Sequence, residues 1–354
     1  MNESKRSKSL TAAISWNELP VYGAQLIRAG VEATSCNVTV IATRPTIPLL
    51  GMEEILNRKI HWIARSGVDS WSRLDVPIPD LFFQAGWYID SFIRLGNEVR
   101  ANGGKVILLS DNCWRNTPRQ WAGAIVYRLF YRQRYAGVWV PGESGSKLMR
   151  FLGVPPDKIY DGLYGSDPDF FQVGPPLPER KQRFIVAGRL TRKKGTPWLA
   201  SAFARFQRES PDWELLVYGD GECKSELFGV PGITLCDFAQ PFEIAQAMRS
   251  SRFLVLPTLV DHWPLVVSEA ALSGCGMILS NEVGNISEFL NDKNGLTFAA
   301  RSTVDLYRAL REAASFPEVK LSKIANESRR LGVKYTPSRW AAQFRKVLAE
   351  TIRE

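Results

Sequence analysis

Residues 252–280 read RFLVLPTLVDHWPLVVSEAALSGCGMILS, and this stretch joins two apolar runs through a polar segment. The first run, 252–257, has no charge after its initial arginine, and the second, 276–280, has none at all, so each is typical of a buried strand. Pro264 is a common first residue of a helix, and Gly274 is a common terminator. The stretch therefore predicts a strand, a helix and a second strand of one parallel sheet.

The same alternation recurs along the whole chain. Short apolar runs alternate with amphipathic segments, which indicates βαβ units. One helix is expected to begin at Thr196 as its N-cap, and the chain is expected to be helical from residue 302 to its end. The expected strands are 10–15, 37–42, 81–84, 105–110, 138–140, 183–188, 213–219, 252–257, 276–280 and 296–298.

A break in this alternation divides the chain. Residues 172–182, QVGPPLPERKQ, are rich in proline and charge and lack periodicity, which is typical of a linker. We therefore expect an N-terminal domain over 1–172, a linker over 173–182 and a C-terminal domain over 183–335. Both are expected to be doubly wound α/β domains with parallel sheets. A single large α/β domain is the alternative, which the length of 354 residues disfavours.

The composition excludes several classes of protein. The net charge of +9 is shared, with 20 cations against 16 anions over 1–172 and 25 against 20 over 173–354, so no concentrated nucleic-acid surface is expected. Five separated cysteines without a CxxC pair and two histidines predict neither disulfides nor a His-rich metal site. Without a spanning apolar run or a secretion signal, a cytoplasmic location is expected.

Charged residues cluster where two expected strands end. Ligands of open α/β sheets bind at the carboxyl ends of the strands, beside helix N-termini. Arg189 follows a strand that ends at Gly188, and Lys194 lies just before the next helix, so the two cations could clamp a diphosphate. A solvated basic loop is the alternative, and it would be preferred if this segment stood alone.

Two acids flank the start of the helix in the opening stretch. Backbone N–H groups of residues 264–266 could bind phosphate there. A carboxylate would repel that phosphate, so Asp261 and Glu269 are expected to bind hydroxyls of ribose and sugar. Alternatively, Asp261 complements the helix dipole and Glu269 is a surface residue, which explains either acid alone but not both beside the cations. Gly284, before a short helix, is a weaker signal of close backbone approach.

These segments together resemble a known family. AGRLTRKKG (187–195), LLVYGDGE (215–222), the stretch 255–290 and NGLTF (294–298) resemble retaining family-4 glycosyltransferases of group 1, which have the GT-B fold. The likeness is weaker over 10–172. It implies an α/β protein of two Rossmann-like domains whose parallel sheets face an interdomain cleft. A C-terminal helix over 336–354 would pack back on the N-terminal domain.

The resemblance also implies roles for individual residues. Arg189 and Lys194 would hold the donor diphosphate, Asp261 would face the donor sugar, and Glu269 would bind the ribose. The backbone at the helix start would meet phosphate and sugar, two glycines would allow close approach, and the loop 234–241 would line the base. The residues of this second group are Gly23, Gly188, Asp237, Phe238, Pro264, Leu265 and Val266.

The chain departs from the family pattern at three places. The first acid is Asp261 where glutamate is usual, and Tyr22 stands beside Gly23 where a glycine pair is usual. The stretch PDLFFQAGW (79–87) lacks the histidine that many members have, so Gln84 or Trp87 would occupy that space. Asp111, after a buried strand, is a further acceptor-side candidate or a turn residue.

The implied activity is transfer of a sugar from a UDP- or GDP-sugar to a glycan or lipid-linked acceptor, with retention at the anomeric carbon. Fixed cations would replace a metal, and no cofactor is expected. A hydrolase or epimerase of the same fold would need a water-activating or ring-deprotonating group, which we do not identify. A non-catalytic nucleotide-sugar-binding protein is the other alternative. The departures at Tyr22 and Asp261 leave it open, whereas Arg189, Lys194 and Glu269 argue against it.

One segment is not accounted for by this activity. Residues 115–137 hold five arginines, several aromatic residues and no acid, and Trp121, Ile125 and Leu129 form an i, i+4, i+8 apolar row. One interpretation is a helix with a core face and a solvated basic face. The other is a docking surface for an anionic membrane or a lipid-diphosphate acceptor, which would make the protein peripheral on the inner face of the cytoplasmic membrane.

Overall fold

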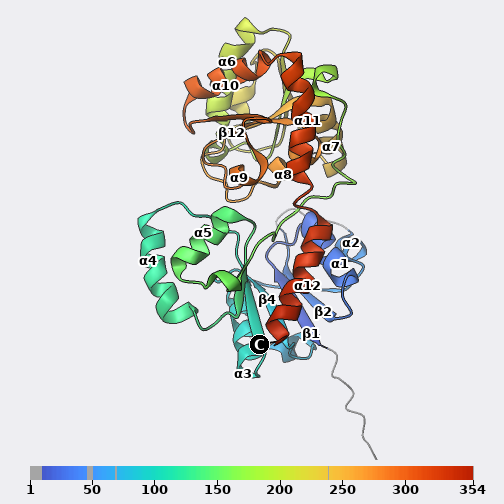
Figure 1. Cartoon of the computed structure of the whole chain (residues 1–354), viewed down its shortest axis with the longest axis vertical. Helices are drawn as coiled ribbons and strands as arrows, with labels where there is room; N and C mark the ends of the chain where they lie inside the picture. The colour runs from blue at the N-terminus through green and yellow to red at the C-terminus, as the bar shows by residue number, and fades with distance from the viewer. Residues whose placement is uncertain (1–9, 46–50, 68–69, 238, 354) are drawn as a thin grey trace, which may run out of the picture. The chain divides into compact units, whose positions relative to one another are not determined.

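The computed structural model describes residues 10–45, 51–67, 70–237 and 239–353. The chain forms two compact units (Figure 1). Unit 1 contains the residues up to Gly165 together with Pro337–Glu354, and unit 2 contains Ser166–Thr336. Each unit is an α/β domain with a parallel sheet, so the predicted fold class is confirmed. No helix in the described part of the chain combines the length and apolar character needed to cross a bilayer.

Unit 1 has a seven-stranded sheet in the order β3-β2-β1-β4-β5-β6-β7. The order reverses between β1 and β4, as in doubly wound sheets. The strands are β1 (Thr11–Trp16), β2 (Asn37–Thr43), β3 (Ile60–Ile63), β4 (Leu81–Ala85), β5 (Lys105–Leu109), β6 (Gly137–Trp139) and β7 (Ile159–Tyr160). The helices are α1 (Val21–Glu32), α2 (Met52–Leu56), α3 (Asp90–Ala101), α4 (Pro118–Val126), the π-helical turn η2 (Tyr127–Tyr131), α5 (Glu143–Leu152) and α12 (Pro337–Arg353).

The last helix, α12, is part of the core of unit 1. Its Trp340 stacks on Trp139 of β6, with ring centroids 4.8 Å apart. Trp340 also fills the space that a side chain at position 30 would need, so Gly30 allows α1 and α12 to approach closely. Burial of these aromatic rings against the sheet ties the end of the chain to unit 1.

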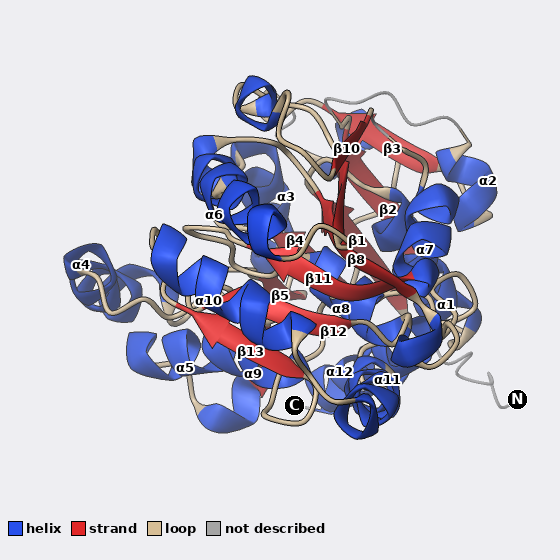
Figure 2. Cartoon of the chain, turned by 90° about the horizontal axis from the view of Figure 1, so that it is seen from above, coloured by secondary structure: helices blue, strands red, loops and turns tan. Residues whose placement is uncertain are grey.

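Unit 2 has a six-stranded sheet in the order β10-β9-β8-β11-β12-β13, which reverses between β8 and β11. Figure 2 shows β8, β11, β12 and β13 side by side. The strands are β8 (Lys181–Ala187), β9 (Glu214–Tyr218), β10 (Ile233–Cys236), β11 (Ser251–Leu256), β12 (Gly276–Ser280) and β13 (Gly295–Phe298). The helices are α6 (Thr196–Glu209), α7 (Pro241–Ser250), α8 (Leu265–Leu272), α9 (Ile286–Phe289), α10 (Thr303–Ala314) and α11 (Glu318–Gly332).

The division between the units lies earlier than the predicted linker. Residues 173–182 are held within unit 2 because Arg180, only 3% exposed, donates hydrogen bonds to four backbone carbonyls. The acceptors are the carbonyls of Pro175, Met248, Ser251 and Ser273, at 2.7 to 3.3 Å. A buried guanidinium with several acceptors fixes the chain around it. The boundary of 172/173 is therefore replaced by 165/166.

Three local predictions also change. The N-cap of α6 is Gly195 rather than Thr196, which is the first helical residue. Pro264 is the N-cap of α8 rather than its first residue. The predicted row of Trp121, Ile125 and Leu129 does not face the core, since these side chains are 55%, 63% and 70% exposed. The core contacts of this segment are made instead by the buried Ala124 and Tyr127.

Candidate functional site

A cavity of about 190 Å³ lies at the carboxyl ends of β8 and β11 in unit 2. The strand order of the sheet reverses between these two strands, and this is the point where open α/β sheets bind ligands. Most residues singled out from the sequence of this half line the cavity. They are Gly188, Arg189, Lys194, Asp261, Pro264, Leu265 and Val266.

The loop after β8 brings the two cations to the cavity. The Thr191 hydroxyl accepts a hydrogen bond from the Lys194 amide at 3.2 Å, which closes a short 3₁₀ turn over 192–194. Gly195 follows with φ of +81°, and any side chain there would collide with the Pro257 carbonyl at the end of β11. Only glycine allows this approach. The Arg189 side chain is exposed and has no hydrogen-bond or ion-pair partner in the described part of the chain.

Lys194 and Asp261 form an ion pair across the cavity. Their side chains are 26% and 16% exposed, so the pair is only partly screened by solvent. Backbone contacts hold both residues in place. The Leu259 amide donates to the Lys193 carbonyl at 2.8 Å, and the Gly284 amide donates to the Asp261 carbonyl at 2.8 Å. The ion pair therefore places one ammonium and one carboxylate beside the same cavity, with Arg189 as an uncompensated positive charge.

Helix α8 begins at the cavity wall. Its first amides, at Leu265 and Val266, precede the first intrahelical hydrogen bond, which the Val267 amide donates to the Pro264 carbonyl at 3.1 Å. Such amides carry partial positive charge and can bind an anion. Asn285, which is fully buried, donates from its side-chain nitrogen to the Pro264 carbonyl at 3.1 Å and fixes the start of the helix.

Glu269 lies one turn further along α8 and does not line the cavity itself. Its side chain is partly buried, and no hydrogen-bond or ion-pair partner for the carboxylate is present among the described residues. Burial raises the pKa of Glu269 to about 7. A partly buried carboxylate without a partner is stabilised by a ligand that donates hydrogen bonds to it.

The predicted base loop is only partly described. Asp237 follows β10 and is exposed, and its carboxylate accepts a hydrogen bond from the Lys224 ammonium at 2.7 Å. Hydrogen bonding to Lys224 and its positive charge lower the pKa of Asp237. Phe238 lies outside the described residues. The roles of both residues stay predictions.

Unit 1 has a smaller cavity, of about 100 Å³, at the carboxyl ends of β1, β4 and β5. Asp111 and Trp87 line it, so these acceptor-side candidates lie together. Gln84 does not join them, because it is buried and donates to the Gly86 carbonyl at 2.9 Å and to the Tyr135 hydroxyl at 3.3 Å. Its side chain serves the packing of unit 1.

Gly23 lies in the first turn of α1 and is buried. A side chain there would come within 3.0 to 3.2 Å of Leu19, Pro20 and Trp16, so packing alone already favours glycine at this position. Among the described residues, no group of three or more His, Cys, Asp or Glu side chains is arranged to hold a metal ion.

Comparison with known proteins connects this geometry to a family. Residues 181–315, less than half of the chain, match the model of the family Glycosyl transferases group 1. No curated protein matches significantly. The match covers β8 to α10, and therefore the whole cavity between β8 and β11. It supports a glycosyltransferase character for unit 2.

Solved structures match over nearly the entire chain. Anabaena HepE in complex with UDP and glucose has a TM-score of 0.73 at 13% identity and covers 96% of this chain and 100% of its own. A glycosyltransferase from Rickettsia africae has 0.74 at 13%, covering 97% and 98%. Sucrose-phosphate synthase from Thermosynechococcus elongatus has 0.70 at 14%, covering 97% and 99%. At such identities the likeness establishes the fold, which is that of GT-B glycosyltransferases.

Three residues that shape the site were not predicted from the sequence. Thr191 closes the turn that presents Lys194, Gly195 allows the loop to meet β11, and Asn285 holds the start of α8. Thr191 directly precedes three basic residues, and threonine is a residue type that commonly caps the start of a helical turn. The sequence therefore contained a usable signal for this turn. Asn285 gave none, because its partner is 21 residues away in the chain.

Proposed function

We propose that the protein is a retaining glycosyltransferase that moves a sugar from a nucleotide diphosphate to an acceptor hydroxyl. The observation that carries the proposal is the single cavity at the reversal point of unit 2. Arg189, Lys194, Asp261 and the first amides of α8 meet there, within the segment that matches Glycosyl transferases group 1. HepE, which has the same fold, binds UDP together with glucose.

The positive charges suit the chemistry of a diphosphate leaving group. When the bond between the anomeric carbon and the phosphate oxygen breaks, negative charge grows on the diphosphate. Arg189, Lys194 and the amides of Leu265 and Val266 would stabilise this charge electrostatically. The pocket thus supplies from fixed protein groups what a divalent ion supplies elsewhere.

Retention follows if the acceptor hydroxyl attacks from the face that the diphosphate leaves. The acceptor oxygen then bonds to the anomeric carbon while the carbon–phosphate-oxygen bond breaks. The acceptor proton passes to the departing phosphate oxygen, so no separate base is required. Asp261 would bind a hydroxyl of the donor sugar while Lys194 orients its carboxylate. Glu269 would accept hydrogen bonds from the ribose hydroxyls.

The proposed substrates are a UDP- or GDP-sugar as donor and a glycan or lipid-linked sugar as acceptor, as in polysaccharide or glycolipid assembly. The five cysteines are free thiols, which is in keeping with a reducing cytoplasm as the place of the reaction. A non-catalytic binder of nucleotide sugars is the second candidate. The observation that favours this second candidate is the ion pair with Asp261, because it engages the Lys194 ammonium that stabilisation of a leaving diphosphate would need.

A turnover assay separates these functions. Release of UDP or GDP from a panel of nucleotide sugars is measured with and without a lipid-linked sugar or oligosaccharide acceptor. A transferase releases nucleotide faster with acceptor, a hydrolase is indifferent to it, and a binder releases none. We expect the double substitution Arg189→Ala with Lys194→Ala to abolish release without unfolding the protein. Lys193→Ala, which removes an exposed cation of the same loop, is the matched control.

A further inference from the structure

Helix α4 and the following π turn expose a continuous apolar face. Within this segment, Ala124 and Tyr127 are buried against unit 1, whereas the opposite side is exposed. We define the apolar strip as the five large side chains on that side. They are Trp121 (55% exposed), Ile125 (63%), Val126 (47%), Leu129 (70%) and Phe130 (62%). Their spacing of four residues in two rows gives one helical face, and such a face on a soluble domain marks an interaction surface.

The surroundings of the apolar strip are strongly basic. The segment between Asn112 and Gly142 contains five arginines and no acid. Arg128 and Arg132 flank the strip residues Leu129 and Phe130 along the chain, and Arg119 lies two residues before Trp121. The side chains of Arg132 and Arg119 are exposed and have no hydrogen-bond or ion-pair partner in the described part of the chain. The segment therefore combines apolar side chains with two exposed cations, Arg119 and Arg132.

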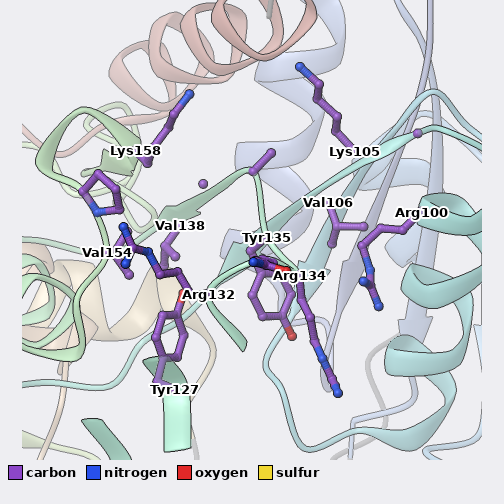
Figure 3. Close-up of a pocket in the computed structure, with 15 residues that line it drawn as sticks. Arg100, Lys105, Val106, Tyr127, Arg132, Arg134, Tyr135, Val138, Val154 and Lys158 are labelled. Atoms are coloured by element: carbon purple, nitrogen blue, oxygen red, sulfur yellow. The ribbon is translucent and has the colours of Figure 1, made fainter. Parts of the chain in front are cut away.

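A large basic cavity adjoins the end of this segment. It has a volume of about 580 Å³ and is bordered by the amino ends of β5 and β6, at the opposite end of the sheet from the cavity lined by Asp111. Its lining includes five cationic residues and no acid (Figure 3). Arg132 belongs to both the cavity and the border of the strip. The cations are Arg100, Lys105, Arg132, Arg134 and Lys158.

Several of these cations are held in place. Lys105 donates to the Thr351 carbonyl at 2.7 Å, and the guanidinium of Arg134 lies 4.8 Å from the centre of the Tyr131 ring. In Figure 3, Lys105 and Lys158 extend to one side of the cavity and Arg100 and Arg134 to the other. Positive groups distributed around a cavity attract phosphate groups, each through charge-assisted hydrogen bonds.

We propose that the apolar strip and the arginines around it dock unit 1 on a bilayer that contains anionic phospholipid. The strip would enter the boundary between headgroups and acyl chains, and the arginines and the basic cavity would bind lipid phosphates. A second copy of the chain fits less well, because pairing two strips would oppose their arginines with no acid from either segment. The proposal is independent of the glycosyl transfer proposed above, which uses a cavity of unit 2.

The test is flotation of the full-length protein with vesicles of phosphatidylcholine alone and with added phosphatidylglycerol, at low and high salt. We expect binding to the anionic vesicles at low salt and little to the neutral ones. Arg119→Glu with Arg132→Glu should weaken the partition by at least about 30-fold, taking about 1 kcal/mol per arginine near the surface. Arg208→Glu with Arg345→Glu makes the same change in net charge on exposed residues elsewhere and should bind as the wild type does.

A second pair of variants tests the apolar strip. Leu129→Gln with Phe130→Gln should lower the partition by at least about tenfold. Val319→Gln with Phe228→Gln is the matched control, since these side chains are likewise 70% and 62% exposed. Equal loss in both pairs, or wild-type protein that stays with the soluble fraction, overturns the proposal. A strip-dependent dimer in sedimentation velocity without vesicle binding would assign the surface to a second copy instead.

Discussion

The ion pair between Lys194 and Asp261 places one charge of each sign beside the cavity at the ends of β8 and β11. A diphosphate bound in this cavity, as proposed, would be repelled by the Asp261 carboxylate, which also engages the ammonium that would otherwise meet the phosphates. Asp261→Asn should therefore tighten binding of free UDP or GDP by about fivefold, corresponding to about 1 kcal/mol. Sugar transfer should nevertheless fall, because an amide replaces the carboxylate that accepts from the sugar hydroxyl. Calorimetric titration and the turnover assay measure the two effects separately.

Asp220→Asn is the control for this change, because Asp220 is exposed in the same unit and does not line the cavity. If Asp261→Asn weakens nucleotide binding, the carboxylate acts mainly by orienting Lys194. That outcome would contradict the repulsion argued here.

The raised pKa of Glu269 predicts a pH-dependent nucleotide affinity. In the proposed complex the ribose hydroxyls would donate to the ionised carboxylate, so we expect binding to be strongest above pH 7 and to weaken as the pH falls below the pKa of about 7. At pH 8, Glu269→Gln should bind the nucleotide diphosphate about 10- to 100-fold more weakly than the wild type. At pH 5.5 the difference should nearly vanish, because the wild-type carboxyl is then protonated. The ratio of the two affinities is informative because it cancels the titration of the phosphates themselves.

Thermal unfolding of the ligand-free protein gives an independent readout for Glu269. Its folded pKa lies above the ordinary value of 4.5, so ionisation between pH 4.5 and 7 destabilises the folded state. Glu269→Gln should therefore raise the melting temperature at pH 8, by about 2–4 °C if the gain is about 1 kcal/mol, and leave it unchanged at pH 4. A ratio of affinities that is constant with pH, together with this stability effect, would make Glu269 a structural residue.

For single residues, the sequence was most informative where the residue type and its position at a strand end pointed to the same site. Arg189, Lys194 and Asp261 could be assigned to one cavity because all three follow strand ends of the same sheet. The choice between Gln84 and Trp87 could not be made from the sequence, because the position of Gln84 on a strand does not reveal which groups its side chain contacts. It bonds to Tyr135, which is 51 residues away.

Among the elements, the loop between β8 and α6 depends on a single glycine. Gly195 has a positive φ, and the Pro257 carbonyl occupies the space of a side chain. Gly195→Ala should unfold the loop or push it from β11, which moves Lys194 and weakens nucleotide binding. Gly229 is the matched control, with φ of +71° and open space where a side chain would lie. Its replacement by alanine should cost only about 1–2 kcal/mol for the backbone conformation.

Chemical unfolding and nucleotide titration distinguish the two glycine variants. We expect Gly195→Ala to lose more free energy of unfolding than Gly229→Ala and to lose nucleotide affinity as well. Equal stability losses with unchanged affinity would mean that the contact with Pro257 is relieved without moving the loop.

The elements that the sequence did not predict are those that lack a strong apolar pattern. Strand β7 has two residues, and β3 and β10 have four each with several partly exposed or polar side chains. Strand β12, which is buried at all five positions, was predicted with its observed bounds, and the bounds of the other long strands were predicted to within two residues. The orientation of α4 could not be predicted, because periodicity identifies an apolar face without telling whether the core or the solvent covers it.

For the whole molecule, alternation of strands and helices was sufficient to predict two parallel sheets. Their strand orders, and therefore the reversal points where the cavities lie, follow from pairings that no local pattern specifies. The boundary between the units was misplaced for a related reason. A segment rich in proline and charge resembles a linker unless the buried partners of Arg180, which are up to 93 residues away, are known.

For the whole molecule, the proposed chemistry predicts that turnover does not depend on a metal ion. The charge that develops on the diphosphate would be met by Arg189, Lys194 and the first amides of α8, all of which line one cavity. These groups are part of the chain, so a chelator cannot remove them. We expect EDTA to leave nucleotide-sugar turnover largely intact, within about twofold of the untreated rate, because each of these charge-stabilising contacts would persist.

The measurement is the initial rate of nucleotide release before and after dialysis against EDTA, with the Arg189→Ala variant beside the wild type. If EDTA abolishes wild-type turnover and Mg²⁺ or Mn²⁺ restores it, the cations of the cavity do not suffice and the proposed leaving-group stabilisation is wrong. If the metal instead rescues only Arg189→Ala, the guanidinium performs in the native protein the task that the ion takes over in the variant.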